Sequence, residues 1–184
     1  MKQDKTTKRI VYTALMAALV YAATMIAFPL LGSKVRLANS VSLLGSLLMG
    51  PVLGGLASGL GSLIYDIQTG YGLESIITFV SKFAMAWVCG KIAFSFSRRA
   101  EDHKWNFVAV TAGAWTYVAL YMLKTFVFQR FVYGFPLDAV WVTMMGKFPA
   151  SAINAVAAMV ISPILYAAVR PALKSAGQLD AMRP

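Results

Sequence analysis

The sequence contains one cysteine, Cys89, and one histidine, His103, among its 184 residues. A lone cysteine cannot form an internal disulfide, and its place in an apolar run is typical of a small buried residue. One histidine beside scattered carboxylates supplies neither a metal-ligand cluster nor a Ser-His-Asp or Cys-His catalytic set. We therefore expect no metal site, no other cofactor and no enzymatic activity.

A nucleotide-binding loop of the form G-x-x-x-x-G-K-[ST] is also missing from the sequence. The segment that comes nearest, Gly90-Lys91-Ile92, lacks both the upstream glycine and the hydroxyl residue that such a loop requires. The chain should therefore not hydrolyse ATP.

Acidic residues are scarce, since seven Asp and Glu face 17 Lys and Arg and the net charge is +10. On a soluble protein this charge would suggest nucleic acid. Here 59% of the residues are hydrophobic, against about 45–50% in soluble domains, and most basic residues flank apolar runs. The sequence therefore predicts a single all-α membrane domain over residues 1–184, embedded in the lipid bilayer and without a nucleic-acid partner.

The number of membrane crossings depends on how the apolar run around Gly50-Pro51 is interpreted. A break at this dipeptide gives six spans with both termini in the cytoplasm, whereas one long helix gives five spans. Six spans place ten basic residues inside, among them Arg98 and Arg99, and only Lys34, Arg36 and Arg130 outside; five spans reverse this bias, against the positive-inside rule. We therefore predict six spans at about 10–31, 38–49, 52–66, 73–96, 105–128 and 139–169.

Three lysines, Lys82, Lys124 and Lys147, interrupt apolar spans at a similar depth. Lys82 and Lys147 lie about 8–9 residues inside the outer ends of their spans, or about 12–14 Å at 1.5 Å per residue, and Lys124 lies late in its span, in the same outer half of the membrane. A charge at the centre of a membrane helix costs about 2.5–3.5 kcal/mol on insertion scales. Snorkelling of the side chains and ion pairs with Asp66, Glu74 or Asp138 are alternative explanations. Three lysines at one level on different helices favour a polar cavity that binds a ligand.

Other polar and aromatic residues on the same spans are candidates to line this cavity. Polar groups fix the orientation of a ligand, and aromatic side chains offer a face on which a flat ring stacks. The aromatic residues fit an interfacial belt or packing as well. With the three lysines, we select Asn39, Asp66, Glu74, Trp87, Tyr121 and Asn154 as substrate-binding residues.

A stripe of small residues, Ala14, Ala18 and Ala22, runs along one face of the first span. Small residues four apart permit close helix contact in lipid. The stripe serves either packing within this chain or docking to another membrane subunit, and its spacing does not separate the two.

Several motifs together resemble the S components of energy-coupling factor (ECF) vitamin transporters. The likeness is concentrated in residues 44–91 and consists of the Gly50-Pro51-x-x-Gly54 hinge, the segment Gly61-Ser-Leu-Ile-Tyr-Asp66, the turn Thr69-Gly-Tyr-Gly72 and Lys82. These features resemble the riboflavin-type group of S components, which also includes proteins for hydroxymethylpyrimidine and vitamin B6.

The resemblance implies a location in the bacterial plasma membrane, a function and a set of partners. An S component binds a vitamin tightly on the outside and docks, here through the Ala14, Ala18 and Ala22 face, onto a membrane coupling protein, the T component, that is joined to two cytoplasmic ATPases. The loop at 28–36 resembles the family's gate over the binding site, and the S component is thought to topple in the membrane to deliver its ligand.

The side chains around the predicted cavity indicate which class of vitamin it binds. Lysines favour a ligand with a phenolate, a carboxylate or good acceptor oxygens, so a pyridoxine-like B6 vitamin or a hydroxymethylpyrimidine fits best. Pantothenate would use the lysines but needs fewer aromatic residues, and riboflavin needs a larger cavity. A stand-alone facilitator, an intramembrane enzyme and an assembly protein are alternative classes. The sequence shows no internal repeat typical of the first and no catalytic set for the second, and the third does not explain the three lysines.

Overall fold

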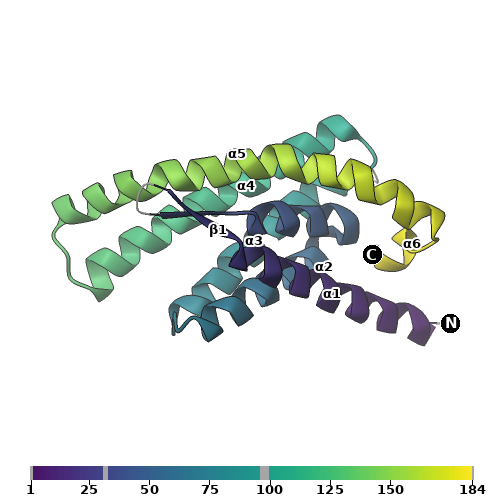
Figure 1. Cartoon of the computed structure of the whole chain (residues 1–184), viewed down its shortest axis with the longest axis horizontal. Coiled ribbons are helices and arrows are strands. Elements are labelled where there is room, and N and C mark those ends of the chain that lie inside the picture. Colours follow the sequence, from purple (N-terminus) through teal and green to yellow (C-terminus); the bar gives the residue numbers. More distant parts are fainter. Residues whose placement is uncertain (1, 31–32, 96–99, 184) are drawn as a thin grey trace.

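The computed structural model describes residues 2–30, 33–95 and 100–183, and it is built almost wholly from helices (Figure 1). Helix α1 (Lys2–Met25) leads into a short antiparallel hairpin of β1 (Ala27–Leu30) and β2 (Ser33–Arg36). The elements that follow are α2 (Ala38–Gln68), α3 (Glu74–Ala93), α4 (His103–Val127), the π-helical turn η2 (Phe128–Val132), α5 (Leu137–Ser175) and α6 (Leu179–Met182).

The hairpin is the one departure from the expected all-α fold in the part of the chain that the structure describes. It pairs Ala27 with Arg36 and Pro29 with Lys34, so α1 ends at Met25 and not at the predicted residue 31. Pro29 explains the early end, because proline has no amide hydrogen and disfavours the helical conformation in the residue before it. The hairpin places Arg36 directly before the start of α2.

Helix α2 consists of two halves, 38–49 and 51–68, that meet at a sharp break. Gly50 adopts φ 82° and ψ −175°, a conformation open mainly to glycine, and Pro51 follows it. A Cβ atom added to Gly54 would lie 2.5 Å from the Cα of Ser46, so the two halves fold back against each other. The predicted break between residues 49 and 52 therefore produces a helical hairpin.

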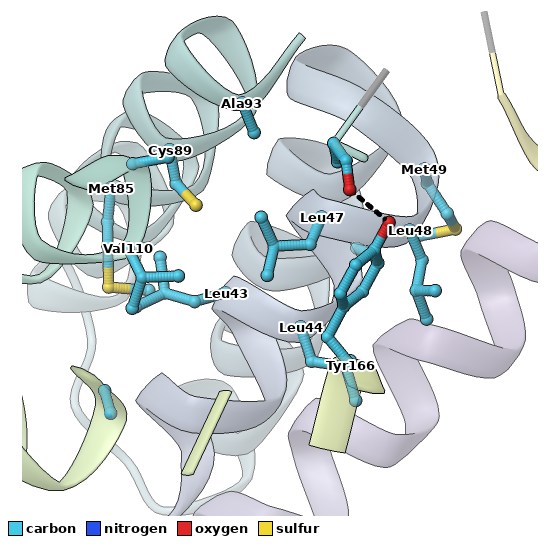
Figure 2. Close-up of a cluster of buried hydrophobic side chains, with 14 of the residues drawn as sticks. Leu43, Leu44, Leu47, Leu48, Met49, Met85, Cys89, Ala93, Val110 and Tyr166 are labelled. Atoms are coloured by element: carbon cyan, nitrogen blue, oxygen red, sulfur yellow. Dashed lines mark hydrogen bonds between the residues drawn. The ribbon is translucent and has the colours of Figure 1, made fainter. Parts of the chain in front are cut away.

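The α2 hairpin lies at the centre of the core, between α1 and α3. A Cβ atom on Gly61 would lie 2.4 Å from the carbonyl oxygen of Ala17 in α1, and one on Gly90 of α3 would lie 2.5 Å from the Cα of Pro51. Figure 2 shows the apolar cluster around the first half of α2, where buried side chains of α2, α3, α4 and α5 meet: Leu43, Leu44, Leu47, Leu48, Met49, Met85, Cys89, Ala93, Val110 and Tyr166.

Both ends of the chain meet at one end of the molecule (Figure 1). Arg9 donates to the carbonyl oxygen of Arg183, and the Tyr12 hydroxyl donates to Gln178. The Tyr166 hydroxyl donates to the carbonyl oxygen of Ala100 at 2.7 Å, a hydrogen bond drawn as a dashed line from Tyr166 in Figure 2. The N-terminal part of α1, the connection from α3 to α4 and the C-terminal segment therefore lie together.

Four of the described helical segments are long and apolar enough to cross a membrane: Ala38–Gln68, Glu74–Ala93, His103–Val132 and Leu137–Ser175. The first of these contains the break at Gly50. Arg98 and Arg99, which supported the predicted six crossings, lie outside the described residues, as do the side chains of Lys2 and Lys34. The fold is thus that of a helical membrane protein with several spans.

The close approach at Gly54 gives a prediction about stability. Gly54→Ala should destabilise the protein by about 1–3 kcal/mol, because the added methyl group meets backbone atoms that cannot move aside cheaply. The matched control is Gly146→Ala in α5, where a Cβ atom meets nothing within 4 Å. Thermal unfolding in detergent should show a lower midpoint for the first variant only. Equal midpoints for both variants would contradict the packing of the two α2 halves.

Candidate functional site

A cavity of ≈ 350 Å³ lies toward the end of the molecule opposite the two termini, where the connections from α2 to α3 and from α4 to α5 are found. Its walls carry polar faces of three helices, in which lining residues recur at the helical spacing of four and seven. These are Glu74, Thr78, Ser81 and Lys82 on α3, Tyr117, Tyr121, Lys124 and Thr125 on α4, and Lys147, Ser151 and Asn154 on α5.

Lys82 is the most deeply buried of the three lysines, with 6% of its surface exposed. Its ammonium group donates to Oδ1 of Asn39, at the start of α2, and lies 4.3 Å from the centre of the Tyr117 ring. A cation over an aromatic face is stabilised by about 0.5–2 kcal/mol, depending on desolvation. Lys82 thus has a hydrogen bond and a cation–π contact, both to neutral partners.

Lys124 and Lys147 lie beside the carboxylate of Glu74. Lys124 forms an ion pair with Glu74 at 2.8 Å, and the charge of Lys147 acts on the same carboxylate. The Tyr133 hydroxyl, in the connection after η2, donates to Glu74 at 3.1 Å, and this hydrogen bond raises the pKa of the Tyr133 phenol. One acidic group at the start of α3 therefore contacts side chains of α4 and of the connection after η2 at the cavity.

Two tyrosines provide an aromatic wall. Tyr117 and Tyr121 lie one turn apart on α4, with ring centres 6.1 Å apart and ring planes 20° apart. Both line the cavity, and Tyr117 also contacts Lys82. Neighbouring rings of this kind offer a face on which a flat heterocycle can stack, next to a cation that binds its polar atoms.

The hairpin contributes Arg36 to the cavity and is fixed by α5. The Arg36 backbone amide donates to Oδ1 of Asn154 at 2.7 Å. The Arg36 guanidinium lies 5.0 Å from the centre of the Tyr65 ring, and its Nη2 is 3.5 Å from the Tyr65 hydroxyl. Asn154 therefore anchors the segment that resembles the family's gate, in addition to lining the cavity.

The structure brings together eight of the nine predicted substrate-binding residues: Asn39, Asp66, Glu74, Lys82, Tyr121, Lys124, Lys147 and Asn154. Trp87 is the exception, because it is not among the residues that line the cavity. Its side chain lies on the outer surface of α3, 40% exposed, with the Lys91 ammonium 5.8 Å from its ring. Trp87 is five residues after Lys82 on α3, and a five-residue step turns the side chain to another face of a helix.

Sequence reasoning did not select Arg36, Ser62 or Tyr117, which also line the cavity. A signal for Tyr117 was present, since it precedes Tyr121 and Lys124 by one and two helical turns on the same face. Arg36 gave no such signal, because the sequence placed it among the basic residues of the outer loops. The hairpin determines its position at the cavity. The serine and threonine residues of the three polar faces follow the same spacing as the lysines.

The predicted docking residues Ala14, Ala18 and Ala22 are all exposed on α1, whereas Thr13, Ala17 and Ala23 are buried. The alanine stripe therefore faces away from this chain's own core. Among the described residues, no group of three His, Cys, Asp or Glu side chains is placed to hold a metal ion.

Comparisons with known proteins agree with this architecture. The family model described as "ECF-type riboflavin transporter, S component" matches residues 4–171. A solved structure reported under the words "Structure and mechanism of the S component of a bacterial ECF transporter" superposes with a TM-score of 0.67. It is 16% identical, and the match covers 92% of this chain and 99% of that one. A search of curated proteins gives no match.

The family match spans nearly the whole chain, and the shared fold includes nearly all of the solved relative. The helices and the buried polar cavity are those expected of a subunit that binds a substrate within a membrane. The chain belongs to the family of ECF-type riboflavin transporter S components, which are multi-pass proteins of the cell membrane.

Proposed function

We propose that this S component captures a small heterocyclic vitamin, of the B6 or hydroxymethylpyrimidine type, in the cavity between α2, α3, α4 and α5. The observation that carries the proposal is the convergence of Lys82, Lys124 and Lys147, from three helices, on one cavity beside two neighbouring tyrosines. Lysines bind acceptor oxygens of the ligand, and the Tyr117 and Tyr121 rings pack against its ring.

The size of the cavity supports a small ligand. Its volume of ≈ 350 Å³ is near the lower end of the range of about 300–1,000 Å³ that is usual for small-molecule sites. A single aromatic ring with short polar substituents suits this volume better than a three-ring flavin. Riboflavin is the second candidate, favoured by the description of the matching family, and pantothenate is a third because the cavity is rich in cations.

Calorimetric titration of the purified chain with pyridoxine, hydroxymethylpyrimidine, pantothenate and riboflavin tests the choice of vitamin. We expect the tightest binding from one of the first two. Micromolar or weaker binding of both, beside nanomolar binding of riboflavin or pantothenate, would reject the proposal for substrate while leaving the S-component assignment intact.

The lysines give a prediction with a matched control on the same helix. Lys82→Met or Lys124→Met should weaken binding of the vitamin by about tenfold or more, because each removes a charge-assisted hydrogen bond. Lys91→Met should bind normally, since Lys91 is exposed and packs over Trp87 away from the cavity. Calorimetry with the tightest ligand of the panel measures all three. Normal binding by both cavity variants would mean that Lys82 and Lys124 are structural.

We also propose six crossings with both termini in the cytoplasm. The folded-back halves of α2 support two crossings where a straight helix would give one. The contacts that join Arg9 to Arg183 and Tyr166 to Ala100 support a common side for the two termini and the connection from α3 to α4. Among the described residues, that side carries the basic residues expected of a cytoplasmic face: Lys5, Lys8, Arg9, Lys104, Arg170, Lys174 and Arg183.

Cysteine labelling tests this topology, because the native Cys89 is fully buried and gives little background. With a membrane-impermeant maleimide on intact cells, Thr69→Cys should be labelled, since residue 69 is exposed on the proposed outer side. Ser175→Cys, exposed at the opposite end, should be labelled only after the cells are permeabilised. Labelling of both variants in intact cells, or of Ser175→Cys alone, would contradict the six-crossing topology.

Transport requires partners in this proposal. The S component delivers its vitamin by docking through Ala14, Ala18 and Ala22 onto a T component, which is coupled to two cytoplasmic ATPases. The outward position of the stripe supports docking over packing within the chain, and small residues permit the close approach that a helix interface in lipid requires.

A bulky side chain on the stripe should separate transport from binding. Ala18→Trp, expressed with the partner subunits, should abolish uptake of the tightest ligand while binding to the purified chain stays normal. Ala168→Trp places the same side chain on another exposed alanine, on α5, and should retain uptake. Unchanged uptake in Ala18→Trp would show that the stripe is not the docking face.

A further inference from the structure

The charged residues that line the cavity form two groups with the same charges but different surroundings. One group, named here the Lys124 group, consists of Glu74, Lys124 and Lys147; the other, the Arg36 group, consists of Arg36, Asp66 and Lys82. Glu74 and Lys82 are eight residues apart on α3, which is about 12 Å along the helix axis. The two groups are therefore separate, and each has one more cation than anion.

In the Lys124 group, the acidic side chain acts on both lysines and contacts one of them directly. Lys124 and Glu74 form an ion pair at 2.8 Å, Tyr133 donates to the same carboxylate, and the charge of Lys147 acts on it too. An incoming anion would compete with Glu74 for both lysines. Lys124 can still donate to an uncharged acceptor oxygen of the ligand, but this group is less suited than the other to bind a charged substituent.

The cations of the Arg36 group have neutral partners. Lys82 donates to Asn39 and lies over Tyr117, and the Arg36 guanidinium lies over Tyr65. The charges of Arg36 and Asp66 both act on Lys82, but no acidic side chain of the described residues lies within 4.0 Å of either cation. A positive charge in excess is thus left in a buried, partly apolar setting, where it costs free energy.

Unsatisfied polar atoms occur in the Arg36 group and beside it. The Arg36 Nε and the Ser62 Oγ are buried without a hydrogen-bond partner, although both residues line the cavity. Ser62 is 2% exposed and lies one turn before Asp66 on α2. Buried donors without partners are rare in folded proteins, and each costs about 1–3 kcal/mol. A serine hydroxyl needs only rotation about one bond to reach a new acceptor.

We propose that Arg36 and Ser62, together with Lys82, form an anion subsite that holds an ionised oxygen of the ligand. The inference rests on the proposed function and adds to it the charge of the ligand and the residues that select for it. Asp66 lies in the same group and opposes an anion, but two cations outweigh it, and its carboxylate can accept a hydrogen bond from a donor on the ligand. The ionised oxygen can belong to a ring phenolate or to a carboxylate.

Matched pairs of compounds test the subsite on the full chain by calorimetry. Pyridoxine against 3-deoxypyridoxine tests a phenolate, while 4-pyridoxate against pyridoxine and pantothenate against panthenol test a carboxylate. We expect the member with the ionised oxygen to bind about tenfold tighter or more in at least one pair, since a hydrogen bond to a charged group is among the stronger ones. The pair that shows the preference identifies the group.

Two serines of α2 give a test variant, Ser62→Ala, and its matched control, Ser58→Ala. Ser62→Ala should reduce the preference within that pair severalfold, whereas Ser58→Ala should leave it unchanged. Ser58 lies one turn earlier on α2 and is likewise buried with an unpartnered hydroxyl, but it does not line the cavity. Arg36→Lys, which keeps the charge but loses Nε, should also reduce the preference.

The outcomes separate this inference from the proposed function. Binding in which the neutral member equals or exceeds the ionised one in every pair would overturn the anion subsite but leave vitamin capture intact. A clear preference that Ser62→Ala and Arg36→Lys both retain would place the anion elsewhere and also overturn the assignment. Failure of every compound to bind would contradict both the subsite and the proposed ligand class.

Discussion

The cost of placing a lysine ammonium at depth in a membrane protein is the constraint on which the rest of the structure depends. Lys82 is nearly fully buried, so its charge must be met by polar groups of the protein or of a ligand. Asn39 and the Tyr117 ring meet part of that need. The polar faces of α3, α4 and α5 enclose these groups in one cavity and keep them away from lipid.

The break in α2 makes this arrangement possible. Because Gly50 takes a left-handed backbone conformation, the two halves of α2 bring Asn39 and Asp66, from opposite ends of the element, to the same cavity. Close contacts at Gly54, Gly61 and Gly90 fix the halves between α1 and α3. The glycines thus contribute to function indirectly, by setting where polar side chains of α2 lie.

Much of the architecture could be predicted from the sequence because it follows from local rules. Gly50-Pro51 indicated the break in α2, and lysines that were too costly to face lipid indicated a cavity. The early end of α1 was not predicted, because an apolar run continues past Met25 and the pairing of β1 with β2 depends on contacts between two segments. The Pro29 signal was present but was taken only as a helix end.

The candidate site likewise contains residues that helical spacing predicts and residues that only the folded chain brings to the cavity. Residues on one helix face, such as Lys147 and Asn154, share a spacing that can be read directly, whereas Trp87 was selected by type and nearness to Lys82 and lies on another face. Arg36 could not be found by spacing, because the hairpin brings it to the cavity. Ion pairs of the lysines with acidic residues were an alternative that the sequence left open, and the folded chain shows that Glu74 pairs with Lys124.

The cavity around Lys82 should hold a small molecule. Native mass spectrometry of the chain released from detergent, after purification from cells, tests this most directly. The account predicts a one-to-one adduct of a vitamin-sized compound on the wild-type protein that is lost or strongly reduced in Lys82→Met. An adduct that persists unchanged in Lys82→Met, or a wild-type protein that carries none even after incubation with the vitamins of the panel, would contradict it.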